Sequence, residues 1–539
     1  MDLASLDVLV VGYGPVGQLL ALQLGQAGLN VAVVERFDKL YHAPRAVHYD
    51  DEVARMFQGA GVGDAIQAIS HSLPSNTVFR YTGCEGQTLM QLVFGGDGQS
   101  AWPMTNGFAQ PELETILDAA VRKLPNVQVM QSWEAVDLQQ SEGGVDLTVR
   151  RRLDSDEVAA GTVRQLHAKY VVGTDGANSF VRSRMNVSVT DLGFSFDWLV
   201  VNVKYRSLDT PHVGMVQACD PKRIVTVTPS GRGRQRFEFM LAPGESAADM
   251  GSPEVTWQLL AGWGLNPGNV ELERHAVYTF NARWANTWRD NRVLLAGDAA
   301  HVMPPFRAQG MCSGMRDATS LAWRLPLVLA GKAPTALLDS YYTERIPHVR
   351  NFIEQTIEAG RMICISDPVA ARQRDAMMLA AMADPARRPP PPPELRLGPG
   401  VLQDGNAHGG RLSFQGFVEH QGQRGRFDDV VGRGWQLIGT SIDPAQHLDV
   451  ENRRFLDSLG ATIAHVTPEG PIRDVDGAYA AWFERKGYGA VLVRPDFYQV
   501  GATSDPAQID DLVRTVRAQL QPTDQPHAAP VQPTSITSQ

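Results

Sequence analysis

Cysteine is scarce in this sequence, and the few cysteines lie far apart. The 539 residues contain four of them, Cys84, Cys219, Cys312 and Cys364, with no Cys-x-x-Cys pair. Scattered thiols in a chain of this length indicate a reducing compartment and argue against a disulfide framework. The thirteen histidines also lack the spacings of metal ligands, so no metal site is predicted.

Long apolar runs and an excess of positive charge are missing as well. No run reaches the roughly 18 apolar residues that a membrane helix needs. Met1-Asp2-Leu3-Ala4 leads straight into a strand-like segment, without the basic stretch of a signal peptide. The 49 basic and 59 acidic residues give a net charge of −10, which argues against nucleic acid as a partner. These absences predict a cytoplasmic protein that binds neither membrane nor nucleic acid.

A glycine-rich turn lies near the start of the chain. It reads Gly12-Tyr13-Gly14-Pro15-Val16-Gly17, between a β-branched run and a helical pattern that closes at Gly28. In a dinucleotide-binding βαβ unit the first glycine permits the turn, the second lets the backbone approach a pyrophosphate, and the third allows close packing. Glu35 ends the next strand, where it can accept from ribose hydroxyls, and Arg36 beside it is a further candidate contact. The motif alone does not separate FAD from NAD.

Two further motifs follow buried strands later in the chain. The first runs from Gly173 through Asp175-Gly176 to Ser179, and the second from Leu294 through Gly297-Asp298 to Pro304-Pro305 and Gly310. With the first turn, they occur in the order found in the group A flavin monooxygenases, the FAD-dependent aromatic hydroxylases, which this sequence resembles. Stretches such as Arg236-Phe237-Glu238 and Val493-Arg494-Pro495-Asp496 resemble the 3-(3-hydroxyphenyl)propionate hydroxylases of that family.

The resemblance implies a set of FAD contacts. The ADP part of FAD would be held by Gly12, Gly14, Pro15, Val16, Gly17, Glu35 and Arg36, the pyrophosphate would lie near Asp175, and the ribityl chain would contact Asp298. The flavin ring would lie beside Pro305, Gly310 and Met311, at a helix N-terminus that favours negative charge on reduced flavin.

Two shorter segments match family residues that contact FAD. They contain Arg45, in Pro44-Arg45-Ala46, and Gln110, in Phe108-Ala109-Gln110-Pro111. A surface arginine and a glutamine that merely starts a helix are the alternatives.

The resemblance implies a monooxygenase that uses NADPH or NADH. In this family NAD(P)H reduces FAD, O₂ adds at flavin C4a, and the hydroperoxide delivers one oxygen atom to a phenolic ring. The expected reaction is ortho hydroxylation to a catechol, on a substrate similar to 3-(3-hydroxyphenyl)propionate, in aromatic catabolism. An FAD oxidase, dehydrogenase or halogenase on the same fold, and a non-catalytic binding module, are the alternatives.

Candidates for contact with the phenol are less well defined. His48, Tyr278 and His212 are the candidate catalytic residues near the hydroxyl, and a packed or exposed side chain is the alternative for each. Phe306 and Met311 are expected to line a dry side of the site. Arg45 and Arg307 are hypothesised to lie near a substrate carboxylate. His48-Tyr49 and Arg307-Ala308 depart from the usual family pattern.

The predicted architecture is α/β, a Rossmann-like FAD-binding fold with two additions. The FAD-binding domain takes residues 1–70, 100–190 and 285–385, and an inserted mixed β-sheet substrate domain of short strands takes 71–99 and 191–284. A Pro-rich linker at 386–394, a thioredoxin-like domain at 395–520 and a disordered tail at 521–539 follow. Because no cysteine follows Cys364, the thioredoxin-like domain cannot run dithiol chemistry. We expect it to be structural or to contact a second subunit in a homodimer.

Overall fold

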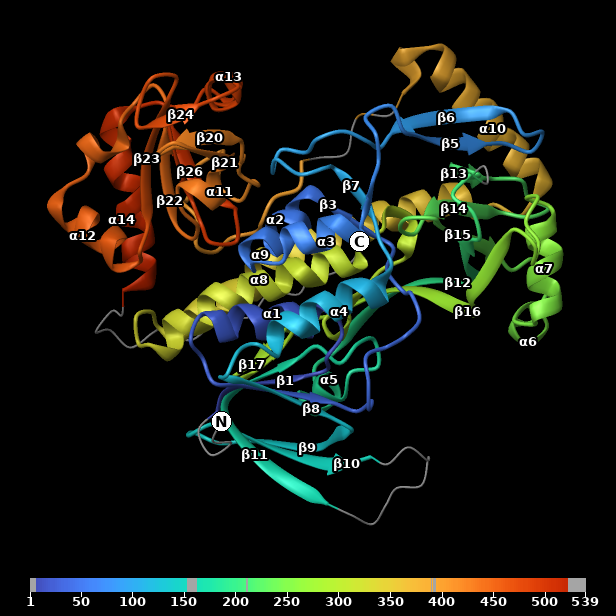
Figure 1. Ribbon diagram of the computed structural model, residues 1–539, viewed down its shortest axis with the longest axis horizontal. Helices are drawn as coiled ribbons and strands as arrows, with labels where there is room; N and C mark the ends of the chain where they lie inside the picture. Colours follow the sequence, from blue (N-terminus) through green and yellow to red (C-terminus); the bar gives the residue numbers. More distant parts are fainter. Residues whose placement is uncertain (1–5, 153–161, 210–211, 389, 391–393, 522–539) are drawn as a thin grey trace, which may run out of the picture.

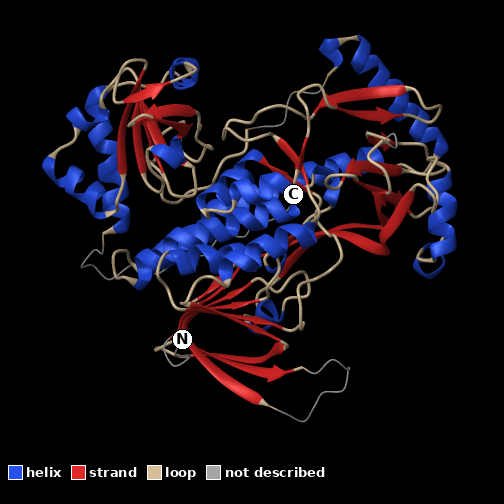
Figure 2. Ribbon diagram, viewed as in Figure 1, coloured by secondary structure: helices blue, strands red, loops and turns tan. Residues whose placement is uncertain are grey.

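The computed structural model describes residues 6–152, 162–209, 212–388, 390 and 394–521. Two large sheets and a layer of long helices precede residue 390, and a smaller unit of sheet and helices follows it (Figure 1). Helices and strands are mixed in all of these parts (Figure 2), which confirms the predicted α/β class. Much of the predicted linker (389 and 391–393), and the predicted tail from 522 onward, lie outside the described residues.

The first sheet contains the predicted βαβ unit. Strand β1 (Leu6–Val11), helix α1 (Pro15–Gln26) and strand β2 (Val31–Glu35) lie where the glycine spacing predicts them. β1 pairs in parallel with β2 and with β11 (Val163–Gly173), and β11 pairs in parallel with β18 (Val293–Leu295). Since β1, β11 and β18 are neighbours, the three motifs that follow them meet at one edge of the sheet.

The remaining strands widen this sheet on both sides. β8 (Val127–Gln131) pairs in parallel with β2, and β17 (Arg289–Asp290) pairs antiparallel with β18. β10 (Val145–Arg151) pairs antiparallel with β11 and with β9 (Trp133–Gln140). The parallel centre of the sheet is buried and therefore rich in valine and leucine.

A layer of helices covers the first sheet (Figure 1). α1 packs against α8 (Gly310–Leu329) and against α4 (Gln110–Val121), and α8 also contacts α9 (Asp339–Ile363). Leu19, Leu20 and Leu24 of α1 are fully buried in the core between helices and sheet. This packing fixes the N-termini of α1 and α8 relative to the strand ends. The short helix α5 (Phe180–Arg184) follows β11.

The second sheet is mixed, as predicted, but its main strands are longer than expected. β12 (Val189–Tyr205) and β16 (Val270–Ala285) have 17 and 16 residues and pair antiparallel along their length. A register shift between Asp191 and Ser195 and exposed residues in the first third of β12 hide its alternating pattern, so only Trp198–Tyr205 stands out in sequence. The other strands, in spatial order from β12, are β15 (Arg234–Met240), β14 (Val225–Pro229), β13 (Met215–Ala218), β5 (Val78–Thr82) and β6 (Thr88–Val93), and β19 (His301–Val302) lies beyond β16.

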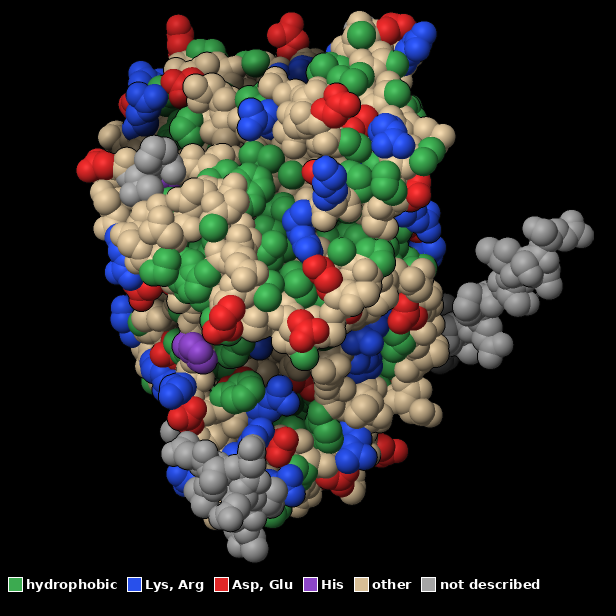
Figure 3. Space-filling model, turned by 90° about the vertical axis from the view of Figure 1, so that its right-hand side faces the viewer, with side chains coloured by type: hydrophobic (Ala, Val, Ile, Leu, Met, Phe, Trp, Pro, Cys, Tyr) green, Lys and Arg blue, Asp and Glu red, His purple; other side chains and the backbone are tan. Residues whose placement is uncertain are grey.

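Smaller elements join the two sheets. β3 (His48–Asp50), β7 (Thr105–Gly107) and β4 (His71–Ser72) form a three-stranded sheet. The helices outside the central layer are α2 (Asp51–Gly59), α3 (Gly63–Ile69), α6 (Ala247–Met250), α7 (Pro253–Ala261) and α10 (Pro368–Ala383). Figure 3 shows the face on the right of Figure 1, where apolar side chains lie between charged ones. Val93 of β6 and Met377 of α10 are large apolar residues that are 66% and 64% exposed.

The C-terminal unit is a seven-stranded sheet with helices packed against it (Figure 1). Its strands, in spatial order, are β21 (Gln423–Arg426), β20 (Phe417–His420), β24 (Ile472–Asp474), β23 (Thr462–Thr467), β22 (Gln436–Gly439), β25 (Ala490–Val493) and β26 (Gln499–Thr503). Its helices are α11 (Phe427–Val430), α12 (Val450–Ser458), α13 (Ala478–Lys486) and α14 (Ile509–Leu520). Two apolar clusters are buried in it, one of which continues onto Trp323 of α8.

Charged residues are buried where this unit meets the rest of the chain. Arg55 of α2 forms an ion pair with Asp428 at 2.7 Å, and Arg494 forms one with Glu344 of α9 at 2.8 Å. A buried charge is stable only with a partner, so these contacts favour one docked arrangement of the unit.

The described residues give no helix that is long and apolar enough to cross a bilayer. Within the same residues, no group of three or more His, Cys, Asp or Glu side chains could hold a metal ion. All four cysteines are free thiols, and Cys219, Cys312 and Cys364 are buried.

Candidate active site

The turn between β1 and α1 is tight because backbone of the second motif packs against it. Gly12 has a φ of +102°, and a β-carbon there would lie 2.6 Å from the carbonyl oxygen of Thr174. A β-carbon at Gly17 would overlap the carbonyl oxygen of Gly12. At Gly14, in contrast, a β-carbon would meet no atom within 4 Å. Packing therefore requires the first and third glycines, while the second faces open space.

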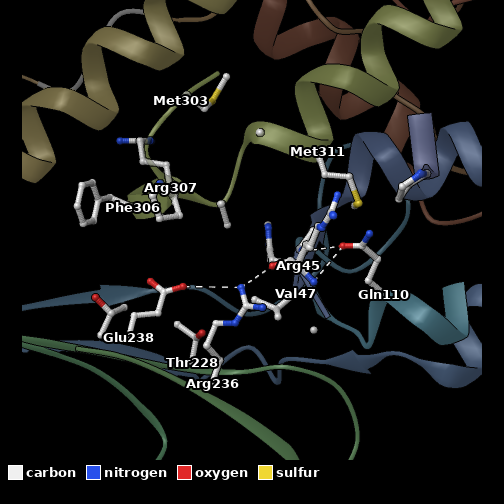
Figure 4. Close-up of a pocket in the computed structure, with 18 of the residues that line it drawn as sticks. Arg45, Val47, Gln110, Thr228, Arg236, Glu238, Met303, Phe306, Arg307 and Met311 are labelled. Atoms are coloured by element: carbon white, nitrogen blue, oxygen red, sulfur yellow. Dashed lines mark hydrogen bonds and ion pairs between the residues drawn. The ribbon is translucent and has the colours of Figure 1, made fainter. Parts of the chain in front are cut away.

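That open space is a cavity of about 360 Å³, within the range of small-molecule sites. Residues of both large sheets and of the central helices line it (Figure 4). The predicted cofactor contacts on its wall are Gly14, Pro15, Val16, Arg45, Gln110, Asp298, Pro305, Gly310 and Met311. Most of the residues that the sequence analysis selected from distant segments thus surround one space.

Asp298 lines this cavity from a turn that buried residues hold in place. The N–H of Gly297 donates to Asp317 Oδ2 at 3.0 Å, and His301 Nε2 lies 2.6 Å from the same oxygen. Asp298 reaches the open space, but protein surrounds it, and this desolvation raises the pKa of its carboxyl. A carboxylate in such a position gains from hydroxyl donors supplied by a ligand.

Asp175 lies differently, because its carboxylate is turned toward α5. It accepts from the hydroxyl of Ser179 and from the N–H of Val181 at 3.0 Å. Its neighbours Thr174 and Gly176 line the cavity, whereas Asp175 does not. The carboxylate therefore shapes the second motif rather than facing the cavity.

Glu35 and Arg36 also lie off the cavity wall. The Glu35 carboxylate accepts from the N–H of Tyr13 at 2.8 Å and from that of Phe37 at 2.9 Å, so it braces the glycine turn. Arg36 is exposed, with its guanidinium 4.9 Å from the centre of the Phe37 ring.

The segment around Arg45 is held from two sides. Gln110 Oε1 accepts from the N–H groups of Ala46, at 2.7 Å, and Arg45, at 3.2 Å. From the second sheet, Arg236 donates to the carbonyl oxygen of Pro44 at 3.2 Å and also to that of Arg45. Gln110 therefore positions the segment through its backbone, while the Arg45 guanidinium packs against the ring of Tyr41 at the cavity wall.

Arg236 and Glu238 are cavity residues to which the sequence analysis gave no role. They approach to 3.7 Å, and both side chains are buried. Burial lowers the pKa of Arg236 to about 10 and raises that of Glu238, with each charge partly offsetting the effect on the other. Their spacing of two in a strand places both on one face, and this alternation was the signal available in the sequence.

His48 lines the cavity close to the start of α8, where Cys312 Sγ lies 3.8 Å from its carbonyl oxygen. Both of its ring nitrogens are buried, and neither makes a well-aligned hydrogen bond with a described residue, although the backbone of Ala308 is close enough to act on the ring and to raise its pKa. Burial lowers the pKa of the imidazole despite the nearby Asp50, so the ring is neutral at pH 7. A buried polar group without a partner costs free energy. Because solvent in the cavity does not reach either nitrogen, the ring would have to turn toward the cavity for a ligand hydroxyl to bond to it.

Aromatic and thioether side chains surround this end of the cavity. Phe306 lies 5.7 Å from Trp198 and 6.3 Å from Phe280, measured between ring centroids. Phe306 and Met311 line the cavity, as expected, together with Met303, Met215, Phe79 and Phe94. Arg307 is exposed to the cavity near Phe306 and makes no ion pair with a described residue (Figure 4).

Tyr278 and His212, the other two catalytic candidates, are not on the cavity wall. Tyr278 lies on β16 with the guanidinium of Arg274 4.9 Å from its ring centre. His212 is exposed and lies against Tyr205, with 4.2 Å between ring centroids. Both rings pack against protein side chains and neither lines the cavity, so neither is placed to touch a ligand there.

Comparison with known proteins agrees with this geometry. The family described as FAD binding domain matches residues 5–356, and the HcaD C-terminal domain matches residues 410–519. A probable NADH-specific resorcinol 4-hydroxylase of Rhodococcus jostii is 34% identical over 96% of this chain and 96% of its own. A 3-(3-hydroxy-phenyl)propionate/3-hydroxycinnamic acid hydroxylase of Comamonas testosteroni is 34% identical over 94% of this chain and 96% of its own. The chain belongs to the FAD-dependent aromatic hydroxylases.

Solved structures show the same fold. The hydroxylase superposes on a flavin-dependent monooxygenase in complex with FAD and substrate, PieE, with a TM-score of 0.78 at 22% identity, covering 96% of this chain and 99% of the other. A p-nitrophenol 4-monooxygenase of Pseudomonas putida gives a TM-score of 0.60 at 28% identity, over 70% of this chain and 95% of the other. The hydroxylase is thus an FAD-dependent monooxygenase of familiar architecture.

The cavity fits the FAD that this family binds. α1 and α8 begin at the cavity without a side-chain cap, so N–H groups of their first turns are available to anionic or carbonyl groups. No side chain closes the space beside Gly14, and a β-carbon at Gly310 would meet only Met303, at 3.9 Å. Together with Asp298, these two helix ends offer suitable partners for the pyrophosphate, the flavin edge and the ribityl hydroxyls.

Proposed function

We propose that the hydroxylase adds a hydroxyl group ortho to that of a phenol, giving a catechol, with NADH as electron donor and O₂ as oxidant. The observation that carries this proposal is His48, a cavity residue with a neutral imidazole whose two buried nitrogens have no well-aligned hydrogen bond among the described residues. A phenol hydroxyl can donate to such a nitrogen, and the resulting negative charge on the ring increases its reactivity.

The bound cofactor would be held by other residues of the cavity wall. FAD, when bound, would supply the electron transfer and oxygen activation that side chains cannot perform. Gly14, Pro15 and Val16 would hold its pyrophosphate, Asp298 its ribityl chain, and the first turn of α8 its ring. Glu35 and Asp175 would act by holding the turns that carry these contacts.

The position of Arg307 favours a substrate that carries a negatively charged group. It is a cation on the cavity wall without an ion pair among the described residues, beside the apolar surface of Phe306. Arg45, also on the wall, packs its guanidinium 4.0 Å from the ring centre of Tyr41. We therefore infer that a phenol with a short carboxylated chain, as in the name of the Comamonas relative, is preferred over resorcinol, and that Arg307 contacts the carboxylate.

The choice of NADH as electron donor follows the Rhodococcus relative, whose name specifies it.

The test of the proposed function is a panel of phenols, with NADH or NADPH, added to FAD-loaded protein while NAD(P)H consumption and product mass are measured. We expect NADH consumption to rise with 3-(3-hydroxyphenyl)propionate and the product to gain one oxygen atom. Oxidation of NADH without a hydroxylated product from any phenol would contradict the proposal.

We propose the domain roles on the same basis. Residues 1–70, 100–190 and 285–385 would bind FAD, and 71–99 with 191–284 would cover the substrate, with 386–394 as a linker. Residues 395–520 would form a thioredoxin-like domain, an assignment that its central sheet with flanking helices supports. Homodimer formation and a cytoplasmic location remain predictions, which light scattering and cell fractionation would test.

A further inference from the structure

A buried chain of polar contacts runs from the C-terminal unit toward the cavity. The hydroxyl of Tyr498, just before β26, donates to Glu52 Oε1 at 2.8 Å. The other carboxylate oxygen of Glu52, in α2, accepts from Arg316 Nε at 2.6 Å. Arg316, in α8, also donates to Asp50 at 2.6 Å and to Gln309 at 2.9 Å. Three segments distant in sequence are thus joined through side chains.

At Asp50 and Gln309, this series of polar contacts reaches the cavity wall. Asp50 is two residues after His48 in β3, and Gln309 immediately precedes Gly310 at the start of α8. Gln309 Nε2 also donates to Asp50 at 3.2 Å. Because His48 and Gly310 both line the cavity, these contacts set the position of the imidazole relative to the first turn of α8.

Tyr498 matters here because Glu52 has few other partners. Glu52 is 5% exposed and is faced by Arg316, Asp50 and Tyr498. Removing the tyrosine hydroxyl would leave a buried carboxylate oxygen without its donor, which destabilises the charged form. Arg316 would then be shared differently between Glu52 and Asp50. The hydroxyl also lies 3.5 Å from His348 Nε2.

We propose that Tyr498 is a positioning residue for the hydroxylation reaction. Through Glu52 and Arg316 it holds the strand of His48 against the first turn of α8, so the C-terminal unit shapes the cavity without lining it. This inference rests on the proposed function of His48, and its test includes a measurement that does not depend on turnover.

Tyr498→Phe removes one hydroxyl and keeps the ring. In the full-length protein loaded with FAD, we expect KM for 3-(3-hydroxyphenyl)propionate to rise about fivefold while kcat changes less than about twofold. The circular dichroism of the bound flavin in the visible range should change as well, because α8 begins beside the proposed flavin site. The matched control is Tyr488→Phe. That ring is buried in the C-terminal unit near Glu394 and Arg411, and we expect neither quantity to change.

A double-variant cycle with Glu52→Gln tests the route of the effect. If Tyr498 acts through Glu52, the double variant has the same KM and flavin spectrum as Glu52→Gln alone, because the second change has nothing left to disrupt. Additive effects, or a Tyr498→Phe protein that matches the wild type in KM and flavin spectrum, would overturn the proposal. Failure of the proposed function would look different, since the wild type would bind FAD and form no hydroxylated product from any phenol. The flavin spectra would still decide the role of Tyr498 in that case.

Discussion

The two ends of the cavity differ in what forms them: backbone lines one end and side chains line the other. The backbone end, near Gly14 and Gly310, is made by a tight turn and two helix N-termini, and steric overlap requires the glycines behind it, Gly12 and Gly17. The end near His48 and Phe306 is made of side chains that come together from separate elements, with polar groups that lack partners. The backbone end is thus fixed by a backbone geometry that many sequences share. At the side-chain end, in contrast, single substitutions can change the substrate preference.

Gly12→Ala should have the largest effect, because it disrupts the backbone end. Strain at φ +102° and overlap with the Thr174 carbonyl would together cost about 4 kcal/mol of folding free energy, and the displaced turn would bind FAD more weakly. Titration of the unloaded protein with FAD, followed by flavin fluorescence, measures this. Gly14→Ala is the control for stability, since its β-carbon meets no atom and its φ is −75°. Its Tm without FAD should equal that of the wild type, and equal FAD affinity in Gly12→Ala and wild type would break the comparison.

His48→Leu should affect only the side-chain end. Loss of a residue that accepts the phenol proton lowers kcat/KM by about a hundredfold. The Tm of the unliganded protein should stay constant or rise, because the imidazole nitrogens have no well-aligned hydrogen bond to lose. Steady-state kinetics and thermal unfolding of the same preparation check both statements. A variant that unfolds earlier and retains kcat/KM would assign His48 to packing.

Sequence patterns predicted the backbone end better than the side-chain end. The β1–α1–β2 unit and the Gly297-Asp298 turn lie where the motifs place them, because glycine conformation and strand ends are local properties. The spacing of two between Arg236 and Glu238 places both on one face of a strand. The contact of Arg236 with Pro44 and the link between Tyr498 and Glu52 depend instead on elements far apart in the chain, which no local pattern encodes. For the same reason Tyr278 and His212 were selected by residue type, although neither side chain lines the cavity.

Arg307→Met tests one role within the side-chain end, the recognition of a substrate carboxylate. We expect KM for a carboxylated phenol to increase about tenfold and KM for resorcinol to stay the same, because only the carboxylate loses a charge partner. Arg372→Met is the control, since Arg372 is an exposed arginine of α10 away from the cavity wall. An equal change in KM for both phenols would remove Arg307 from carboxylate recognition.

The smallest predicted effect is the pH dependence of kcat/KM. Burial lowers the pKa of His48 below its usual value of about 6.5, so the neutral, proton-accepting form persists into mildly acidic solution. We expect kcat/KM to fall only as the pH drops below about 6.5. His48→Leu should lack this decrease in its pH profile of kcat/KM. A decrease that begins above pH 7 in the wild type would point to another group.

The most direct test of the account is a crystal structure of the FAD-loaded protein with 3-(3-hydroxyphenyl)propionate bound. We predict the phenol oxygen within about 3 Å of a His48 ring nitrogen, with the FAD pyrophosphate beside Gly14. A phenol bound away from His48, or FAD held outside the cavity between the two sheets, would contradict it.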